Sequence, residues 1–298
     1  MGAARTALLA WVRARRSGGA FIVRFEDLDR ERVREGSQRA ILEDLAWLGL
    51  DFDEGPGRPG AAGSCIQSAR TGLYEAAFLR LKARGLLYPC TCSRREIARS
   101  ASAPHGEDEP AYPGTCRSGA AHPGRPQAWR FRMERAQPFK DALAGDQAGV
   151  RDDFVVRRAD GAFAYQLACA VDDAAMGVSE VVRGADLLGS ASRQQALHLA
   201  LGQDPPAWLH VPLMLGPDGA RLSKRHASVA VSAYRDAGWS APQLLGLLAG
   251  SLQRRDEAPR HSWLRAPSAA QLAERLDPLD IPPEASRFDG PWPGDQIP

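Results

Sequence analysis

Four stretches of the chain place apolar residues three or four positions apart, as amphipathic or core helices do. In the first stretch Leu8, Trp11 and Val12 recur at this spacing, while arginines keep to the opposite face. Gly18 and Gly19 then end the helix. The four predicted helices are residues 7–16, 36–50, 72–87 and 240–253.

A short β-rich run, AFIVRF at residues 20–25, follows the first helix and ends in the acidic cluster EDLD at 26–29. A helix, a tight turn and a buried strand form the second half of a βαβ unit. We therefore expect the first strand of that unit to lie just upstream of Met1. Together with the other helices, this order predicts an α/β protein with a doubly wound sheet, interrupted by an insertion at about residues 88–183.

Composition sets the outer limits of size and partner class. The chain has 298 residues, 44% of them hydrophobic, which suffices for one large domain with an insertion or for two domains. It has neither an apolar stretch long enough to span a bilayer nor a secretory layout, so we expect a cytoplasmic protein without a membrane partner. A net charge of +2 gives no strong basic field, and a nucleic acid would have to be held by local patches.

Three of the five cysteines crowd into one segment, where Cys90 and Cys92 flank a single residue and Cys116 follows a polar loop. This spacing favours a metal site over three ordinary reduced thiols, which remain the alternative. Tetrahedral zinc would need a fourth ligand, from Tyr112, His105, His122 or water. Cys65 and Cys169 stand apart, and we expect each to be a small buried residue rather than a ligand.

Residues 210–231, HVPLMLGPDGARLSKRHASVAV, run from an apolar strand through a Pro-Asp-Gly turn into a cationic loop. Lys224 and Arg225 in this loop suit the neutralisation of phosphate charge during attack at phosphorus. The alternative is a solvated surface loop, as most charge runs are.

The order of these motifs resembles one family. RFEDLD, CxC with YxxxC, DFVVRRADGAFAYQLACAVDD, VVRGADLL and RLSKR follow one another as they do in class I aminoacyl-tRNA synthetases of the glutamyl type. The resemblance covers about residues 1–250. It is strongest to a short branch of that family, whose members attach glutamate to the queuosine base of tRNA(Asp) rather than to a tRNA 3′ end.

The resemblance implies the Rossmann-type parallel sheet of class I synthetases, with a zinc-containing insertion and a short helical C-terminal region. The expected units are a first half of the catalytic domain at 1–87, the insertion at 88–183, the second half with the signature loop at 184–232, and a helical region with an irregular tail at 233–298. Only about 70 residues follow the signature loop. We therefore expect no anticodon-binding domain.

Two signature motifs bind ATP in this family. The KMSKS-like loop corresponds to Arg221, Leu222, Ser223, Lys224 and Arg225, and Lys224 inherits the catalytic role of stabilising the ATP phosphates. Gly2 matches the glycine of the HIGH motif, where a missing side chain lets the nucleotide approach the backbone. In the family a strand with an arginine, a serine and a histidine precedes this glycine, and we expect an in-frame upstream segment to supply them. The alternative is a protein that lacks this strand, which would put its activity in doubt.

Three further positions match residues that bind glutamate in the family. Glu26 matches the acid that contacts the substrate, and Tyr165 matches a substrate-contacting tyrosine. Arg183 matches the arginine that takes a substrate carboxylate, a role that its planar fork suits. Asp27 and Asp29 fit salt-bridged surface acids better than Glu26 does.

The residues around Tyr165 have structural interpretations. Phe163 and Leu167 alternate as core residues do, and we expect them to be buried. Asp172 and Asp173 are expected in a neighbouring turn without a catalytic task.

The family pattern of CxC followed by TyrxxxCys is met by Cys90, Cys92, Tyr112 and Cys116. The resemblance implies one structural zinc ion, which holds an insertion that faces the tRNA. The loop between the two halves of the pattern is longer here, so His105 stays a rival to Tyr112.

The implied reaction needs no nucleophile from the protein. The carboxylate of L-glutamate attacks the α-phosphorus of ATP, magnesium assists at the phosphates, and the glutamyl group passes to tRNA(Asp) bearing queuosine. The alternatives are a truncated synthetase that charges a tRNA 3′ end and a non-catalytic zinc-containing RNA-binding module. We expect a monomer.

Overall fold

The computed structural model of the chain describes residues 1–29, 31, 33–100, 112–216, 218–220, 222, 230–252 and 268–288. The helices of these ranges are α1 (Gly2–Arg16), α2 (Ser37–Leu48), α3 (Thr71–Ala83), α4 (Arg94–Ser100), α5 (Tyr165–Ala175), α6 (Leu188–Ala200), α7 (Val231–Asp236), α8 (Ala241–Gly250) and α9 (Ala269–Arg275), with short 3-10 turns at Gln67–Ala69 and Ala185–Leu187. All four helices predicted from periodicity are present, as α1, α2, α3 and α8.

The central sheet has the strand order β4-β3-β7-β6. Its strands are β3 (Phe139–Asp141), β4 (Gly145–Gln147), β6 (Glu180–Gly184) and β7 (Ala207–Val211). β3 and β6 pair with β7 in parallel, whereas β4 pairs with β3 antiparallel. The expected all-parallel sheet is therefore wrong in this part, because a tight turn after Asp141 sends the chain straight back beside β3. Asp141 stabilises that turn by accepting the N–H groups of Leu143 and Ala144.

The predicted strand at residues 20–25 is extended but joins no ladder. Ile22 and Phe25 form isolated parallel bridges to Glu54 and Ile66. The N–H groups of Val23 and Phe25 donate to the carbonyls of Glu54 and Cys65, which lie in an irregular loop. These backbone N–H groups are therefore hydrogen-bonded although no regular strand lies beside them.

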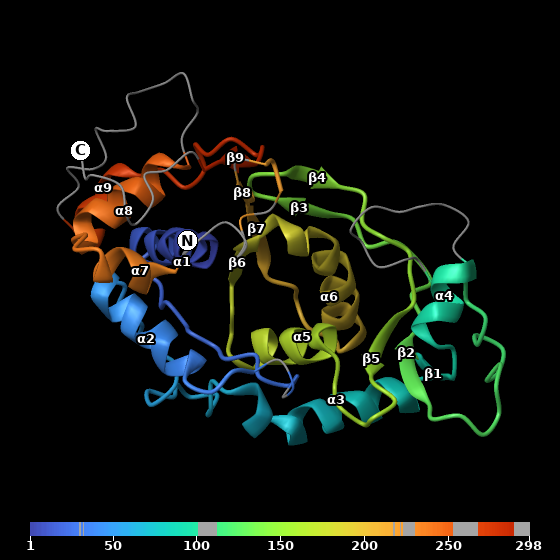
Figure 1. The fold of residues 1–298 in the computed structure, drawn as a ribbon. Coiled ribbons are helices and arrows are strands. Elements are labelled where there is room, and N and C mark those ends of the chain that lie inside the picture. Colours follow the sequence, from blue (N-terminus) through green and yellow to red (C-terminus); the bar gives the residue numbers. More distant parts are fainter. Residues whose placement is uncertain are drawn as a thin grey trace.

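Helix α1 packs between β6 and the C-terminal helices α8 and α9 (Figure 1). Its predicted apolar stripe is buried, with Leu8 and Val12 fully inaccessible. Arg5, on the same helix, is buried as well and donates to the Pro212 carbonyl and to Ser286 Oγ. These bonds tie α1 to the segment before β8 (Met214–Leu215) and to β9 (Ser286–Arg287). The two strands pair in parallel.

A smaller antiparallel sheet, β1-β2-β5, lies at the other end of the molecule (Figure 1). Its strands are β1 (Leu87–Cys90), β2 (Ala128–Phe131) and β5 (Phe154–Arg157). One face packs against α3 and α5 in a core that includes Phe131, Phe154 and Leu167. The sheet positions the CxC motif, because β1 ends at Cys90.

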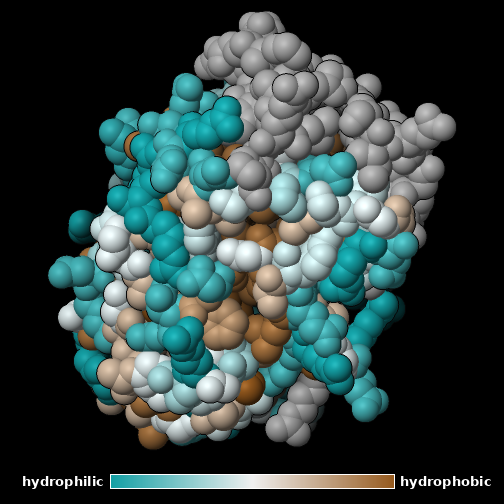
Figure 2. Space-filling model, turned by 90° about the vertical axis from the view of Figure 1, so that its left-hand side faces the viewer, coloured by the Kyte–Doolittle hydropathy of each residue, from teal (hydrophilic) through white to brown (hydrophobic). Residues whose placement is uncertain are grey.

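One face of the molecule has apolar side chains at its centre (Figure 2). Figure 2 shows the side that lies at the left in Figure 1, where apolar side chains gather in a hollow at the middle of the face and hydrophilic ones surround it. None of the described helices is both long enough and apolar enough to cross a bilayer.

Candidate active site

The three residues expected to bind glutamate come from different elements and meet beside the first turns of α5. Glu26 directly follows the bridge residue Phe25, Tyr165 begins α5, and Arg183 is near the end of β6. The Arg183 guanidinium Nη1 lies 3.4 Å from the Tyr165 hydroxyl. On the other side, Cys169 Sγ lies 3.2 Å from Glu26 Oε1. Tyr165 and Cys169 are one helical turn apart, so they connect the acid to the arginine.

The Glu26 carboxylate is held in place and still open to a ligand. Arg24 Nη2 donates to its Oε1 at 3.2 Å, and Arg24 Nη1 donates to Asp173 at 2.7 Å. The Glu26 side chain is 36% exposed, whereas the Asp173 side chain is 4% exposed. Asp173 thus anchors the arginine, and the arginine orients the exposed acid.

The prediction that Asp172 and Asp173 lie in a turn is wrong. Both lie in α5 and are buried. Asp172 accepts from Arg70 Nε at 2.6 Å and from the Tyr74 hydroxyl at 2.8 Å. These ionic and hydrogen-bonding partners are what makes two buried carboxylates tolerable.

The two other acids of the EDLD run have structural roles. Asp27 accepts from the backbone N–H and the hydroxyl of Ser68, at 2.8 and 2.7 Å. Asp29 pairs with Arg158 at 3.8 Å. The prediction of a salt bridge is confirmed for Asp29, whereas Asp27 stabilises the 3-10 turn instead.

Arg183 is a buried cation whose partners among the described residues are neutral acceptors. Its Nε donates to His210 Nε2 at 3.0 Å, its Nη1 to Gln194 Oε1 at 2.7 Å, and its Nη2 to the Leu187 carbonyl at 3.2 Å. The side chain also lies over the Trp208 ring, 5.0 Å from its centroid. A buried guanidinium with no carboxylate beside it favours an anionic ligand.

The Tyr165 hydroxyl is a neutral group between the two charges. Burial raises its pKa, and the neighbouring Cys169 and Glu26 raise it further. Phe163 and Leu167 flank Tyr165 in the sequence. Both are buried in the core, as predicted. Cys65 and Cys169 are buried too, in agreement with the sequence.

Most of the KMSKS-like loop lies outside the described residues, including Arg221, Ser223, Lys224 and Arg225. Leu222 is described, and its N–H donates to the Met214 carbonyl at 2.8 Å. Gly2 is the first residue of α1, and a Cβ built on it would meet nothing within 4 Å. Packing therefore does not require glycine at this position.

The three thiols of the predicted metal site converge. Cys90, Cys92 and Cys116 have sulfur atoms that all lie within 4.8 Å of one another, and Cys92 is 3.5 Å from Cys116. The Tyr112 hydroxyl is 3.4 Å from the Cys90 sulfur and 3.8 Å from the Cys92 sulfur. Four donor groups from two segments thus enclose one point, which suits a tetrahedral metal ion.

Of the other candidates for fourth ligand, His122 is turned away. Its Nε2 lies 3.2 Å from a carboxylate oxygen of Glu96. His105 lies outside the described residues. Tyr112 is therefore the candidate whose side chain the structure places among the thiols.

The surroundings favour negative charge at Cys116, whereas burial and the hydrogen bond with Cys116 raise the pKa of Cys92 to about 11. Burial alone would raise the pKa of Cys116, but hydrogen bonds from Ala121, Thr91, Tyr112 and Cys92 lower it to about 6. Arg130 Nε donates to Cys90 at 3.3 Å, and its guanidinium lies over the Tyr112 ring, 3.8 Å from the centroid. A cation at this distance offsets the charge of thiolate ligands.

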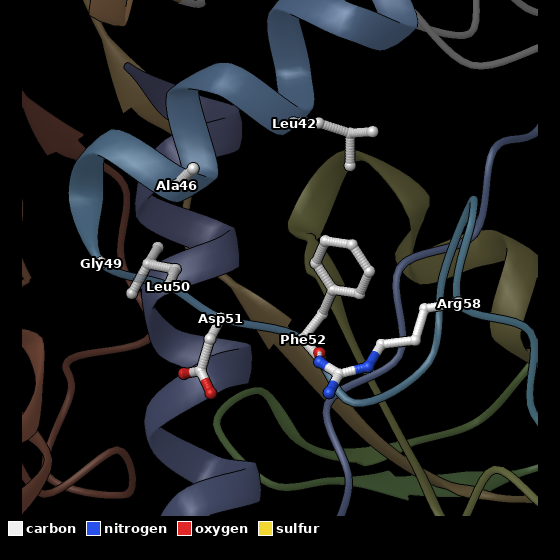
Figure 3. Close-up of a pocket in the computed structure, with 7 residues that line it drawn as sticks. All are labelled: Leu42, Ala46, Gly49, Leu50, Asp51, Phe52 and Arg58. Carbon is white, nitrogen blue, oxygen red and sulfur yellow. Dashed lines mark hydrogen bonds between the residues drawn. The ribbon is translucent and has the colours of Figure 1, made fainter.

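Two surface pockets accompany these sites. Figure 3 shows one of about 290 Å³ between α2 and the loop after it, lined in part by Leu42, Phe52 and Arg58. None of the expected site residues lines it. A second pocket of about 430 Å³ includes Leu28 and Phe163, which lie two positions from Glu26 and Tyr165 in the sequence.

Comparison with known proteins identifies similar sequences over most of the chain. The family model described as "tRNA synthetases class I (E and Q), catalytic domain" matches residues 1–252. A Glutamyl-Q tRNA(Asp) synthetase of Symbiobacterium thermophilum is 50% identical over 262 residues, which cover 84% of this chain and 81% of that protein. A Glutamate--tRNA ligase of an Anaeromyxobacter strain is 42% identical over 245 residues, which cover 80% of this chain and 52% of that protein.

A solved structure shares the fold. The crystal structure of glutamate-tRNA synthetase from Elizabethkingia anophelis superposes with a TM-score of 0.80 at 25% sequence identity. The match covers 97% of this chain and 65% of the synthetase. The chain thus spans just under two thirds of that longer enzyme.

Proposed function

This chain belongs to the catalytic-domain family of class I tRNA synthetases for glutamate and glutamine, and on that premise we propose that it is a ligase that activates L-glutamate with ATP. We further propose that it transfers the glutamyl group to the queuosine base of tRNA(Asp). The second step rests on the similarity to proteins named Glutamyl-Q tRNA(Asp) synthetase, of which this chain covers most of the length.

The observation that carries the first step is the placement of opposite charges on the two sides of Tyr165. Glutamate carries an ammonium on its α-carbon and, beside the α-carboxylate that attacks ATP, a second carboxylate at the end of its side chain, so the ammonium and this second carboxylate can reach two separate partners. Glu26 offers an open carboxylate to the ammonium, and Arg183 offers a guanidinium to a carboxylate. Tyr165 lies between them as an uncharged hydrogen-bonding group.

The nucleotide would lie at the N-terminus of α1, with its phosphates bound by the KMSKS-like loop. Gly2 leaves the helix N-terminus open, where backbone N–H groups favour a phosphate. Lys224, with Arg221 and Arg225 in the same loop, would neutralise the charge that develops during attack at the α-phosphorus. Magnesium bound with ATP would share that task. The protein positions and neutralises, and the substrate carboxylate is the nucleophile.

We propose zinc for the thiol cluster, with Cys90, Cys92, Tyr112 and Cys116 as ligands. Zn–S bonds of about 2.3 Å place tetrahedral sulfurs about 3.8 Å apart, close to the 3.5 Å between Cys92 and Cys116. Four protein ligands leave no open position, so the ion would be structural. It would hold α4 and the segment after Tyr112 onto β1. The boundaries of the surrounding insertion, 88–183, stay a prediction.

The second candidate function is the charging of a tRNA 3′ end. It is supported by the similarity to the Anaeromyxobacter Glutamate--tRNA ligase, but only over 52% of that protein. A non-catalytic zinc-containing RNA-binding module is less consistent with the site, because such a module would have no use for an open acid, Glu26, and a buried arginine, Arg183, connected through one face of α5.

Glutamate-dependent exchange of labelled pyrophosphate into ATP tests the activation step. We expect exchange with L-glutamate and not with L-aspartate, whose shorter side chain cannot span the same contacts. No exchange with any amino acid would contradict the proposal, and exchange with L-glutamine instead would assign a different substrate.

A further inference from the structure

We propose that His210 and Asp141 are positioning residues that fix the orientation of the Arg183 guanidinium; this inference rests on the proposed function of the same pocket. The three side chains form a chain of hydrogen bonds across the central sheet. Arg183 Nε lies 3.0 Å from His210 Nε2, and His210 Nδ1 lies 2.6 Å from Asp141 Oδ2. The side chains of His210 and Asp141 are fully buried.

The sheet itself sets up this alignment. Arg183 on β6 is paired in register with His210 on β7, and β7 also pairs with β3, which ends at Asp141. The three residues therefore come from three neighbouring strands. The hairpin of β3 and β4 lies within residues 88–183, the range expected for the insertion. It nevertheless belongs to the central sheet and supplies Asp141.

The partners determine which ring nitrogen of His210 carries the proton. The Nε of an arginine is always a donor, so His210 Nε2 must accept and carries no hydrogen. His210 Nδ1 faces a carboxylate oxygen and therefore carries the hydrogen. A neutral histidine in this tautomer transmits the fixed position of Asp141 to Arg183.

Asp141 is a rigid end point for the chain of contacts. Its Oδ2 also accepts the backbone N–H of His210 at 3.0 Å, and its Oδ1 accepts the N–H groups of Leu143 and Ala144 at 3.0 and 2.8 Å. Burial alone would raise the pKa of the Asp141 carboxyl, but the hydrogen bond from the His210 ring, together with the N–H groups of Ala144 and Leu143, holds it below its usual range. A charged, fully hydrogen-bonded carboxylate cannot turn without breaking several bonds.

The consequence is that Arg183 presents a defined edge to the pocket. His210 occupies Nε, and Gln194 and Leu187 take one N–H each from Nη1 and Nη2. The contact of Nη1 with the Tyr165 hydroxyl is long at 3.4 Å, so this N–H is available to a ligand without any movement of the guanidinium. A bidentate carboxylate contact requires that the plane of the guanidinium is fixed before the ligand arrives.

Burial of a histidine in this protein does not by itself require such partners. His198 on α6 is buried as well, and neither of its ring nitrogens has a hydrogen-bond partner in the part of the chain that the structure describes. His198→Gln is therefore a matched control for His210→Gln.

Kinetics of glutamate-dependent pyrophosphate exchange test the inference. In His210→Leu the hydrogen-bond acceptor for Arg183 Nε is lost, so the guanidinium is no longer held in position for the substrate carboxylate. We expect the KM for glutamate to rise about 10–100-fold with kcat little changed, because this contact with the substrate is weakened in the ground state and in the transition state alike. His210→Gln keeps an acceptor near the position of Nε2 and should recover most of the affinity. Asp141→Asn should give an intermediate increase, and His198→Gln none. An unchanged KM in His210→Leu, or the same increase in His198→Gln, would overturn the inference.

The tautomer of His210 gives a readout that does not depend on activity. Long-range ¹H–¹⁵N spectra of the histidine side chains should contain a neutral Nδ1–H ring that disappears in His210→Gln and moves in Asp141→Asn. This test holds even if His210→Leu fails to fold. A His210 ring protonated on Nε2 would overturn the positioning role, whereas the absence of exchange in a wild-type protein with the expected tautomer would count against the proposed function alone.

Discussion

The thiol of Cys169 lies 3.2 Å from the carboxylate of Glu26, although 143 positions separate the two residues in the sequence. Cys169 is one turn along α5 from Tyr165, whose hydroxyl contacts Arg183. A single face of α5 therefore connects an acid to a basic group, and the function proposed for the chain depends on that arrangement.

Glu26→Gln should raise the KM for glutamate about 10–100-fold, because an amide cannot pair with the substrate ammonium as a carboxylate does. Steady-state pyrophosphate exchange measures this effect. Asp27→Asn is the matched control, since Asp27 stabilises the turn at Ser68. The control should lower the free energy of unfolding by about 1 kcal/mol and leave the KM unchanged. Equal changes of KM in both variants would argue against a substrate contact of Glu26.

Gly2→Ala should weaken ATP binding without destabilising the protein. A Cβ at this position meets nothing within 4 Å, so the free energy of unfolding should change by less than about 1 kcal/mol. We expect a higher KM for ATP, because the added methyl group would lie where the nucleotide approaches the backbone. Gly72→Ala at the start of α3 also has open space and serves as the control. An unchanged KM for ATP in Gly2→Ala would place the nucleotide elsewhere.

Several of these features could be predicted from the sequence, because they depend on local periodicity or on a family motif. The stripe of Leu8 and Val12 identifies α1, and the motifs locate Glu26, Tyr165 and Arg183. The residues that support them could not be found in this way. His210 is visible only as a polar residue in an apolar run, and nothing near it in the sequence points to Asp141.

The wrong predictions, for Asp172 and Asp173 and for the central sheet, also arise because local sequence patterns do not show contacts between distant residues. Asp172 and Asp173 looked like turn residues because two adjacent acids rarely occur in a buried helix face. Their partners, Arg70 and Arg24, are about 100 and 150 positions away. Likewise β3 and β4 are three-residue strands with too few apolar positions to give an alternating pattern.

Purified protein should contain about one zinc ion per chain, and Cys92→Ser should lose most of it, because three donors hold zinc less tightly than four. Tyr112→Phe should release zinc faster to a chelator. Elemental analysis and chelator kinetics measure both effects. Cys65→Ser removes a buried thiol outside the cluster and should keep the full metal content. Equal metal in wild type and Cys92→Ser would contradict the site.

Stability at acid pH should depend on Asp153. Burial alone would raise the pKa of its carboxyl, but Arg117, Tyr88 and the N–H of Met133 hold it below the usual range. The stability that Asp153 contributes is therefore fully present above about pH 4 and is lost as pH falls through the pKa in the folded state.

Asp153→Asn should accordingly lower the free energy of unfolding by about 1–3 kcal/mol at pH 7 and flatten its decline between about pH 5 and pH 3. Denaturant unfolding at a series of pH values gives both quantities. Asp160→Asn, on an exposed turn, should leave the pH profile of the wild type in place. A steeper decline of the free energy of unfolding in Asp153→Asn than in the wild type would mean that folding raises the pKa of Asp153 instead of lowering it.

Transfer of labelled glutamate to RNA tests the central claim most directly. Purified protein is incubated with ATP, magnesium, labelled L-glutamate and either tRNA(Asp) with queuosine, tRNA(Asp) without queuosine, or tRNA(Glu). The proposed function predicts label only on the queuosine-containing tRNA(Asp), and that label should still be acquired after the 3′-terminal adenosine of the tRNA has been removed. Label on tRNA(Glu) that is abolished by this removal would contradict it.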